Sequence, residues 1–150
     1  MRVSVPLPSD FPFVTEVPVY ISHINYGGHL DNALLLTLVS EARLRFLKSM
    51  GFTELDVDGV GIIVADAAVQ YRAEAFHGDL LEVRMGAGNL GRKGCDLIWQ
   101  MADHKTGHEV ARGKTGIVFF DYAARQVVEM PAAFRRAVSA RSPEPHACAA

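Results

Sequence analysis

The residues with the clearest chemical potential lie between positions 23 and 32, in the sequence His-Ile-Asn-Tyr-Gly-Gly-His-Leu-Asp-Asn. Glycine residues let a ligand approach the backbone closely. A helix that begins directly after them offers unpaired N–H groups and the positive end of its dipole, which suit a carbonyl oxygen that gains negative charge during a reaction. The pattern predicts either a substrate-binding junction or an ordinary capped helix start, and the local sequence favours neither.

Two carboxylates further along the chain are candidates for acid–base chemistry. Glu41 lies at the border of the apolar stripe of the helix that follows the junction. There it can point into a cleft as a general base or form a surface ion pair with Arg45 one turn later. Asp66 lies inside the apolar run of residues 62–69, where an unpaired charge would be costly. Asp66 therefore needs a partner, either at a site or at a subunit interface.

Other catalytic patterns are absent from the sequence. There is no Gly-x-Ser-x-Gly elbow, no Walker phosphate loop and no Gly-x-Gly-x-x-Gly after a strand. No set of His, Cys and Asp residues has the spacing of a zinc site, so we expect no metal and no cofactor. Cys95 fits a packing residue in a strand, and His104 and His108 fit a solvated hairpin.

Length and composition narrow the class of protein. A chain of 150 residues with 49% hydrophobic side chains fits one domain with its own core. Its 15 basic and 17 acidic residues give a net charge of -2, which argues against a nucleic-acid partner. No apolar run reaches the roughly 20 residues that span a bilayer, and prolines interrupt any signal-like stretch near the start. Because Cys95 and Cys148 make a poor disulfide framework, we expect a cytoplasmic protein without a membrane partner.

The candidate residues lie on a predicted order of one strand, one long helix, four strands and a short final helix. Apolar and β-branched residues predict a first strand over 13–24, with Pro18 indicating an edge position. After the breaker Asn-Tyr-Gly-Gly, Asp31 or Asn32 can cap a helix that runs to about Met50. Four strands follow over 61–71, 80–90, 94–103 and 108–121, and then a short helix over 131–138. This order predicts an α+β domain over residues 1–138 and, because residues 139–150 lack periodicity, a disordered tail.

Both faces of the predicted sheet carry apolar side chains, since Ile117 and Phe119 alternate with Val118 and Phe120. One helix cannot cover both faces, and an antiparallel sheet that leaves one face in water should be polar there. We therefore expect a second subunit, with an isologous dimer as the commonest arrangement.

The junction and the order of elements together resemble the hotdog-fold thioesterases, in particular the 4-hydroxybenzoyl-CoA thioesterase-like acyl-CoA thioesterases. The family's junction, Asp-x-Asp-x-x-Gly-His-x-Asn-Asn, corresponds to residues 23–32, and its helix motif Glu-Ala-Arg before a glycine corresponds to residues 41–43 and Gly51. Residues 71–79 (Tyr-Arg-Ala-Glu-Ala-Phe-His-Gly-Asp) are similar to the family's strand–turn segment, and Pro131 to the proline that opens its last helix. The resemblance covers roughly residues 13–138.

The resemblance implies a hotdog fold, in which a five-stranded antiparallel sheet wraps around one long helix. Two subunits would join their sheets edge to edge near residues 61–71 to form a homodimer, and such dimers can pair into a homotetramer. The thioester would lie at the dimer interface with its carbonyl near the start of the helix. The implied activity is hydrolysis of an acyl-CoA or acyl-carrier-protein thioester to the free acid.

One departure from the family pattern bears on the mechanism. Asn25 occupies the position of the family's catalytic carboxylate, and His23 replaces the other aspartate. An amide cannot ionise to act as a base. By the resemblance, Asn25 positions the substrate or the water, Glu41 is the general base or nucleophile, and Asp66 is the reserve carboxylate. The substrate-binding residues that the resemblance implies are His23, Gly28, His29 and Asn32, with backbone N–H groups of residues 28–32 facing the oxyanion.

Two other functions stay open at this point. Asn25 favours a non-catalytic acyl-CoA binding module, and the hotdog fold also serves dehydratases, although their helix motif is not seen here. Arg92 and Lys93, between two predicted strands, are candidates for superficial contacts with the phosphates of CoA. For either residue alone, a solvated hairpin is the favoured explanation.

Overall fold

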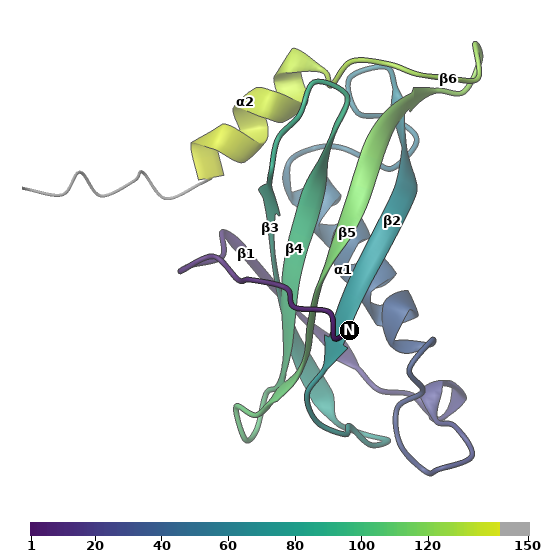
Figure 1. The fold of residues 1–150 in the computed structure, drawn as a ribbon, viewed down its shortest axis with the longest axis vertical. Helices are drawn as coiled ribbons and strands as arrows, with labels where there is room; N and C mark the ends of the chain where they lie inside the picture. The colour runs from purple at the N-terminus through teal and green to yellow at the C-terminus, as the bar shows by residue number, and fades with distance from the viewer. Residues whose placement is uncertain (142–150) are drawn as a thin grey trace, which may run out of the picture.

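The protein forms an antiparallel sheet with one long helix on one face, as Figure 1 shows for the computed structural model, which describes residues 1–141. The elements in chain order are β1 (Phe13–Pro18), the 3-10 turn η1 (Ile21–His23), α1 (Leu35–Ser49), β2 (Gly61–Tyr71), β3 (Leu80–Gly88), β4 (Gly94–Asp103), β5 (Glu109–Asp121), β6 (Gln126–Val127) and α2 (Ala132–Arg141). This order confirms the predicted α+β architecture.

The first predicted strand is divided at Pro18. β1 ends at this proline, and residues of the predicted strand reappear as η1, which ends at His23. Proline has no N–H to donate to a ladder, which suits the end of an edge strand, and Val19 still exchanges hydrogen bonds with Asp79 O (2.9 Å) and the Gly78 N–H (3.0 Å) before η1 begins. β1 pairs with β3 alone and is an edge strand of the sheet, as Pro18 indicates.

The sheet is antiparallel and has the strand order β1-β3-β4-β5-β2, with β6 paired to the end of β5. It therefore has six strands, and the predicted number of five is wrong. β6 consists of two residues that return from a tight turn after β5, in which Asp121 Oδ1 accepts hydrogen bonds from the N–H groups of Ala123 (2.9 Å) and Ala124 (3.0 Å). A strand of this length has no alternation from which the sequence could predict it.

Helix α1 packs its apolar stripe against the sheet. Leu35, Leu38, Val39, Ala42 and Phe46 are buried, as their spacing predicts. Leu47, which lies beside that stripe, is completely buried as well. The buried part of the helix is therefore wider than that of a surface helix, and α1 forms the centre of the core with the inward residues of β4.

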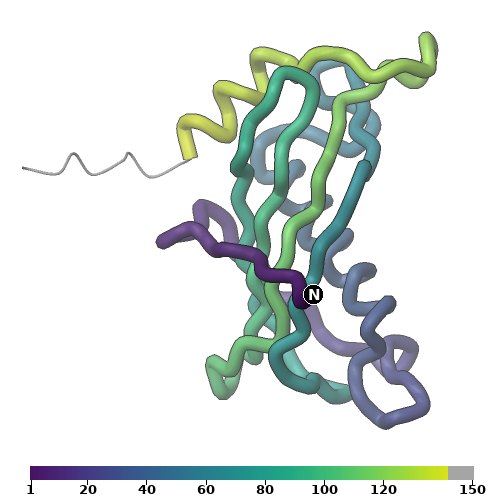
Figure 2. Tube along the Cα trace, in the orientation of Figure 1, coloured from purple at the N-terminus to yellow at the C-terminus, as the bar shows by residue number. Residues whose placement is uncertain are grey.

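The opposite face of the sheet is more polar than its sequence suggests. Val118 and Phe120 are half-buried there, but they share the face with charged residues such as Asp96 and Lys114. Figure 2 shows the N-terminal residues crossing the sheet on the side away from α1. Val5 is buried in this segment, and its N–H donates to Gln70 Oε1 (2.6 Å). The chain itself thus covers part of the face that was expected to need a second subunit.

Helix α2 closes the end of the sheet where β3 turns into β4 (Figure 1). Phe134 is buried against Phe119, with ring centroids 5.0 Å apart. The helix follows Pro131, as predicted, but continues to Arg141, three residues beyond the predicted end. Residues 139–141 therefore belong to α2, and the rest of the predicted tail lies outside the described residues.

Candidate active site

The junction between η1 and α1 is a short turn closed by backbone hydrogen bonds. The Gly28 N–H donates to Asn25 O (3.0 Å) and the Asn25 N–H donates to His29 O (3.0 Å). Gly28 has a φ of +82°, a left-handed conformation that glycine adopts at no steric cost. The sequence Asn-Tyr-Gly-Gly therefore gives a tight loop that brings residues 25 and 29 next to each other.

The Asn25 side chain orders this loop. Its Oδ1 accepts a hydrogen bond from the Gly27 N–H (2.9 Å), and its side chain helps to lower the pKa of the nearby Asp31 carboxylate. Asp31 also accepts the N–H groups of Leu34 (3.0 Å) and Ala33 (2.8 Å) in the turn before α1. These backbone hydrogen bonds lower the pKa of Asp31 below its usual value, and the bond from Leu34 has the larger effect of the two. The carboxylate therefore stays ionised, and it fixes both the helix entrance and Asn25.

His29 is the ionisable ring of the junction. Its Nδ1 lies 3.2 Å from Leu30 O, and because a carbonyl oxygen can only accept, Nδ1 carries the hydrogen of this contact. Nε2 lies 3.9 Å from Glu74 Oε1, and the ring packs beside Gly27. In the neutral tautomer that has its hydrogen on Nδ1, Nε2 is an acceptor and can take a proton from water.

A cavity of about 270 Å³ lies against this junction. Its apolar walls come from Leu30, Leu35, Ala75 and Val110, and its polar rim from Asn25, His29, Asn32, Tyr71, Arg72 and Glu74. The Tyr71 hydroxyl donates to Asn32 O (2.7 Å), which links the end of β2 to the start of the helix. The structure thus brings three predicted residues, Asn25, His29 and Asn32, to one cavity.

The backbone N–H groups of residues 28–32 are not equally available. Those of Gly28, Leu30 and Asp31 donate to carbonyl groups of the protein. In the described part of the chain, the N–H groups of His29 and Asn32 form no such hydrogen bond. Both residues line the cavity, so these two N–H groups are the candidate donors for a substrate carbonyl, and that of Asn32 is the nearer in sequence to α1.

His23 and Gly28 support the loop without lining this cavity. His23 Nδ1 accepts the Tyr20 N–H (3.0 Å), and the two rings lie with centroids 5.7 Å apart. Gly28 supplies the left-handed turn. Both residues therefore have a structural explanation in the geometry of η1 and the loop.

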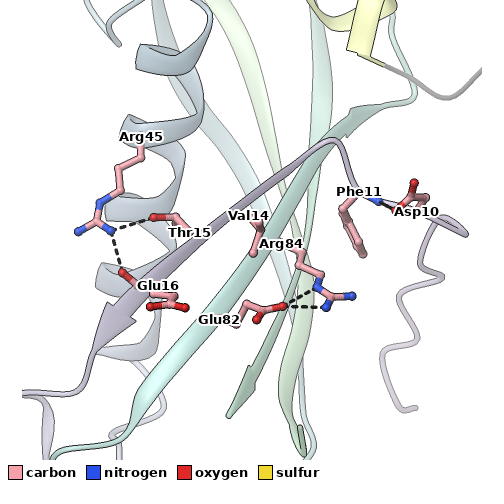
Figure 3. A pocket seen from close by; sticks show the side chains of 8 residues that line it. All are labelled: Asp10, Phe11, Val14, Thr15, Glu16, Arg45, Glu82 and Arg84. Atoms are coloured by element: carbon pink, nitrogen blue, oxygen red, sulfur yellow. Dashed lines mark hydrogen bonds and ion pairs between the residues drawn. The ribbon is translucent and has the colours of Figure 1, made fainter. Parts of the chain in front are cut away.

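Glu41 lies in the middle of α1, away from the junction. Its Oε1 is 3.3 Å from Arg45 Nη2, the ion pair that the i,i+4 spacing allows, and its side chain is 46% exposed. Arg45 in turn donates to Thr15 Oγ1 (2.9 Å) and Glu16 O (2.8 Å) on β1, as Figure 3 shows. Glu41 is not among the residues that line the Asn25 cavity.

The groove that contains Arg45 is the largest of the described cavities, at about 640 Å³. Figure 3 shows that it runs beside β1 and is lined by Asp10, Phe11, Val14, Thr15, Glu16, Arg45, Glu82 and Arg84. Its arginines are already paired, because Arg84 binds Glu82 at 2.7 Å and Arg45 binds β1. None of the junction residues lines it, so its size alone does not make it the active site.

Asp66 lies on the face of the sheet away from α1. It follows a bulge in β2 and pairs with Lys114, which also lies 3.1 Å from Asp96 Oδ1. The hydrogen bond with Asp66 is the main cause that raises the pKa of Lys114 above its usual value. Asp66 thus has the partner that its sequence context demands, and it does not line the Asn25 cavity.

Three rim residues of the cavity, Tyr71, Arg72 and Glu74, were not among the predicted site residues. They lie in the Tyr-Arg-Ala-Glu segment, whose similarity to the family's strand–turn segment was the available signal. The sequence does not reveal that β2 pairs with β5 or that the Leu30 N–H donates to Ala75 O (2.7 Å). These contacts place the segment beside the junction.

Arg92 and Lys93 lie in the turn between β3 and β4, where Arg92 pairs with Glu129 (3.3 Å). Gly94 pairs with Val118, whereas Tyr71 at the cavity pairs with Ala111. Val118 and Ala111 are seven positions apart on β5, which corresponds to roughly 23 Å along the strand. Within one protomer these cations are therefore far from the Asn25 cavity.

Three further observations concern a metal site, a membrane-spanning helix and a cysteine nucleophile. Residues 1–141 contain no group of three or more His, Cys, Asp or Glu side chains that could hold a metal ion. No helix in the same part of the chain has the length and apolar character needed to cross a membrane. Burial raises the pKa of the Cys95 thiol to about 12, so this cysteine is a packing residue and not a nucleophile.

Comparison with known proteins identifies the class. The family model of the thioesterase-like superfamily matches residues 19–138, so the chain belongs to that superfamily. No curated protein matches the chain.

Solved structures share the fold at low sequence identity. A 1,4-dihydroxy-2-naphthoyl-CoA thioesterase from Synechocystis is 19% identical with a TM-score of 0.77, covering 85% of this chain and 95% of that one. A thioesterase from Thermus thermophilus, solved with coenzyme A and Zn, is 22% identical with a TM-score of 0.76, covering 92% and 99%. A DHNA-CoA thioesterase from Staphylococcus aureus is 18% identical with a TM-score of 0.76, covering 85% and 88%. These similarities confirm the hotdog fold, and the substrates in the names belong to those proteins.

Proposed function

We propose that the protein is an acyl-CoA thioesterase that hydrolyses its substrate at the Asn25 cavity. The observation that carries this proposal is the meeting of Asn25, His29 and the free Asn32 N–H at one cavity beside the start of α1. Membership of the thioesterase-like superfamily and the CoA thioesters named for similar structures support the same reaction.

The reaction needs a donor for the developing oxyanion and a group that activates water. The Asn32 N–H, at the positive end of α1, serves as the donor. Asn25 orders the loop and orients the substrate, since its amide cannot ionise. His29 Nε2 takes a proton from the attacking water, which adds to the thioester carbonyl. Collapse of the tetrahedral intermediate expels the thiolate, which leaves as the thiol once it has gained a proton.

Glu41 and Asp66 are the alternative bases. Neither lines the cavity of its own protomer, so each would have to act on the cavity of a neighbouring subunit. We propose a homodimer joined through β2, in which such a contribution is possible, and a dimer of dimers as its further assembly.

The size of the cavity limits which part of the substrate it takes. Sites for whole drug-sized ligands measure about 300–1,000 Å³, and the Asn25 cavity measures about 270 Å³. The cavity therefore suits the acyl group and the thioester, and the nucleotide of CoA, or a carrier protein, stays outside it.

A thiol-release assay on a panel of aromatic and aliphatic acyl-CoA thioesters tests the proposal. We expect turnover by the wild type and a loss of about 10²–10⁴ in His29→Gln, which removes the general base. Glu41→Gln and Asp66→Asn are the comparison variants. If Glu41→Gln loses turnover and His29→Gln keeps it, the base is Glu41. If Asp66→Asn loses turnover and His29→Gln keeps it, the base is Asp66. Thermal unfolding of each variant separates lost chemistry from lost fold.

One alternative has an observation of its own in its favour. Asn25 replaces the ionisable group of the family pattern, which suits a module that binds acyl-CoA without hydrolysis. Binding of acyl-CoA by calorimetry, with no thiol released from any member of the panel, would establish that function instead.

A further inference from the structure

Arg72 is the one guanidinium on the rim of the Asn25 cavity, and its backbone is fixed. The chain leaves β2 at this residue, and the N–H groups of Arg72 (2.8 Å) and Ala73 (3.1 Å) both donate to Val110 O. The residue is therefore held against β5 before its side chain makes any contact.

Glu109 forms an ion pair with the guanidinium of Arg72. Arg72 Nε lies 3.1 Å from Glu109 Oε1. The same carboxylate accepts Arg112 Nε (3.0 Å), Arg112 Nη2 (2.9 Å) and Gln100 Nε2, so both of its oxygens are fully engaged. Burial opposes ionisation of this group, but the hydrogen bonds from Gln100 and Arg112 and the two arginine charges lower the pKa of Glu109 overall. The lowered pKa favours the ionised form of Glu109, and this carboxylate holds Arg72 with Nε as its nearest atom.

The outer nitrogens of Arg72 remain open. Within residues 1–141, Nη1 and Nη2 of Arg72 form no hydrogen bond and Glu109 is the one carboxylate paired with this side chain, which is 51% exposed while it lines the cavity. The deeper walls of this cavity are aliphatic. A guanidinium whose Nη groups are free presents a planar pair of donors that matches a carboxylate.

We propose that Arg72 determines the acyl specificity of this site by binding a second carboxylate, so that the preferred substrates are short dicarboxylic acyl thioesters. This inference rests on the proposed function. The cavity takes the acyl side of the thioester, and the pantetheine arm separates the phosphates of CoA from the thioester, so Arg72 faces the acyl group. Glu74, the acidic residue on the same rim, is 64% exposed, and solvent screens its repulsion of a second anion.

The test compares dicarboxylic with monocarboxylic acyl groups of the same carbon number. Glutaryl-CoA is measured against pentanoyl-CoA and adipoyl-CoA against hexanoyl-CoA, after subtraction of the uncatalysed rate. We expect the wild type to have the higher kcat/KM for the dicarboxylic member. Arg72→Gln should reduce that preference by about 10- to 100-fold, because a charge-assisted pair of hydrogen bonds is lost. Arg72→Lys, which keeps the charge without the planar fork, should fall between the two.

Arg84→Gln is the matched control. Arg84 is 54% exposed and pairs with one carboxylate, Glu82, but it does not line the cavity, so its variant should keep the wild-type preference. Each variant is first checked for an unchanged circular dichroism spectrum and thermal midpoint.

The remaining outcomes overturn the inference in distinguishable ways. If the wild type hydrolyses acyl-CoA without a dicarboxylic preference, or if Arg72→Gln slows all substrates equally, Arg72 is not a specificity residue although the thioesterase proposal stands. If the effect of Arg72→Gln disappears with phosphate-free pantetheine thioesters of the same acids, the arginine binds phosphate. If no thioester is hydrolysed, the proposed function itself fails.

Discussion

At the scale of single residues, Asn25 illustrates how an amide replaces a carboxylate. Its Oδ1 accepts the Gly27 N–H and its amide nitrogen faces the Asp31 carboxylate. An aspartate at this position can repeat the first contact, but it would meet Asp31 as a second negative charge. The amide is therefore matched to the acidic helix entrance that follows it.

This arrangement predicts the behaviour of Asn25→Asp. We expect measurable thioesterase activity, because the change restores the carboxylate common in the family pattern. We also expect a lower thermal midpoint at neutral pH than at a pH near 4, since repulsion from Asp31 grows as both groups ionise. Thermal unfolding between pH 4 and 8, alongside thiol release, checks both parts. A midpoint that rises with pH as in the wild type would contradict the contact between residues 25 and 31.

The two glycines of the loop have different roles, and alanine variants separate them. A Cβ on Gly27 would lie 3.1 Å from His29 Nε2 and 3.3 Å from Asn25 Oδ1. A Cβ on Gly28 would meet no atom within 4 Å, but its φ of +82° is unfavourable for alanine. We expect Gly27→Ala to lower turnover with little change in stability, and Gly28→Ala to cost about 1 kcal/mol of stability. Equal kinetic losses in both variants would indicate that the His29 position is not critical.

At the scale of elements, the sequence predicts the regular parts of the fold well. The spacing of Leu35, Leu38 and Phe46 predicts α1, and Gly-rich separators predict the limits of β3, β4 and β5, because each signal is local. The division of the first strand at Pro18 is local too, but η1 has only three residues and no period to recognise.

The candidate site is predictable only in part, and the reason is register. Asn25, His29 and Asn32 are neighbours in the chain, so the junction could be found from spacing alone. The cluster around Glu109 joins residues of β4, β5 and the end of β2, and no sequence pattern states which residues of these strands lie opposite each other. Whether the side of α1 that holds Glu41 faces the cavity depends in the same way on how the sheet packs around the helix.

The capping turns at the ends of the elements predict a stability loss in acid. Backbone hydrogen bonds lower the pKa of Asp31 at the entrance to α1 and of Asp103 at the β4–β5 turn. A group with a lower pKa in the folded state contributes stability that is complete above its unfolded value of about 4 and is lost as the pH falls through the folded value. We expect the thermal midpoint to fall between about pH 5 and 3. Asp31→Asn, which can cap without titrating, should show a smaller fall.

At the scale of the whole molecule, the two edges of the sheet differ. On β1, Arg45 donates to the Glu16 carbonyl and Pro18 has no N–H, so this edge is closed to another strand. On β2, the contacts at the edge involve Ile62, whose N–H donates to Glu54 O (2.8 Å) and whose carbonyl accepts the Tyr122 hydroxyl (2.9 Å). From Val64 to Tyr71 the described chain provides no such cover, and both of these side chains are about half exposed. The free edge for a second copy is therefore β2.

This difference predicts the outcome of placing a charge on each edge. Val64 on β2 is 45% exposed and Val14 on β1 is 55% exposed, so the same substitution is tolerated by either side chain in the monomer. Val64→Lys brings two like charges and a desolvation cost into a symmetric β2–β2 contact, whereas Val14→Lys faces the groove that Glu82 and Arg84 of its own chain line and brings no charge to β2. Sedimentation at micromolar protein should give a dimer for the wild type and Val14→Lys and a larger monomer fraction for Val64→Lys. If the three proteins sediment alike as dimers, subunits pair through another surface. If the wild type itself is a stable monomer, then Glu41 and Asp66 have no route to a neighbouring cavity, and the water must be activated by a group of the same chain.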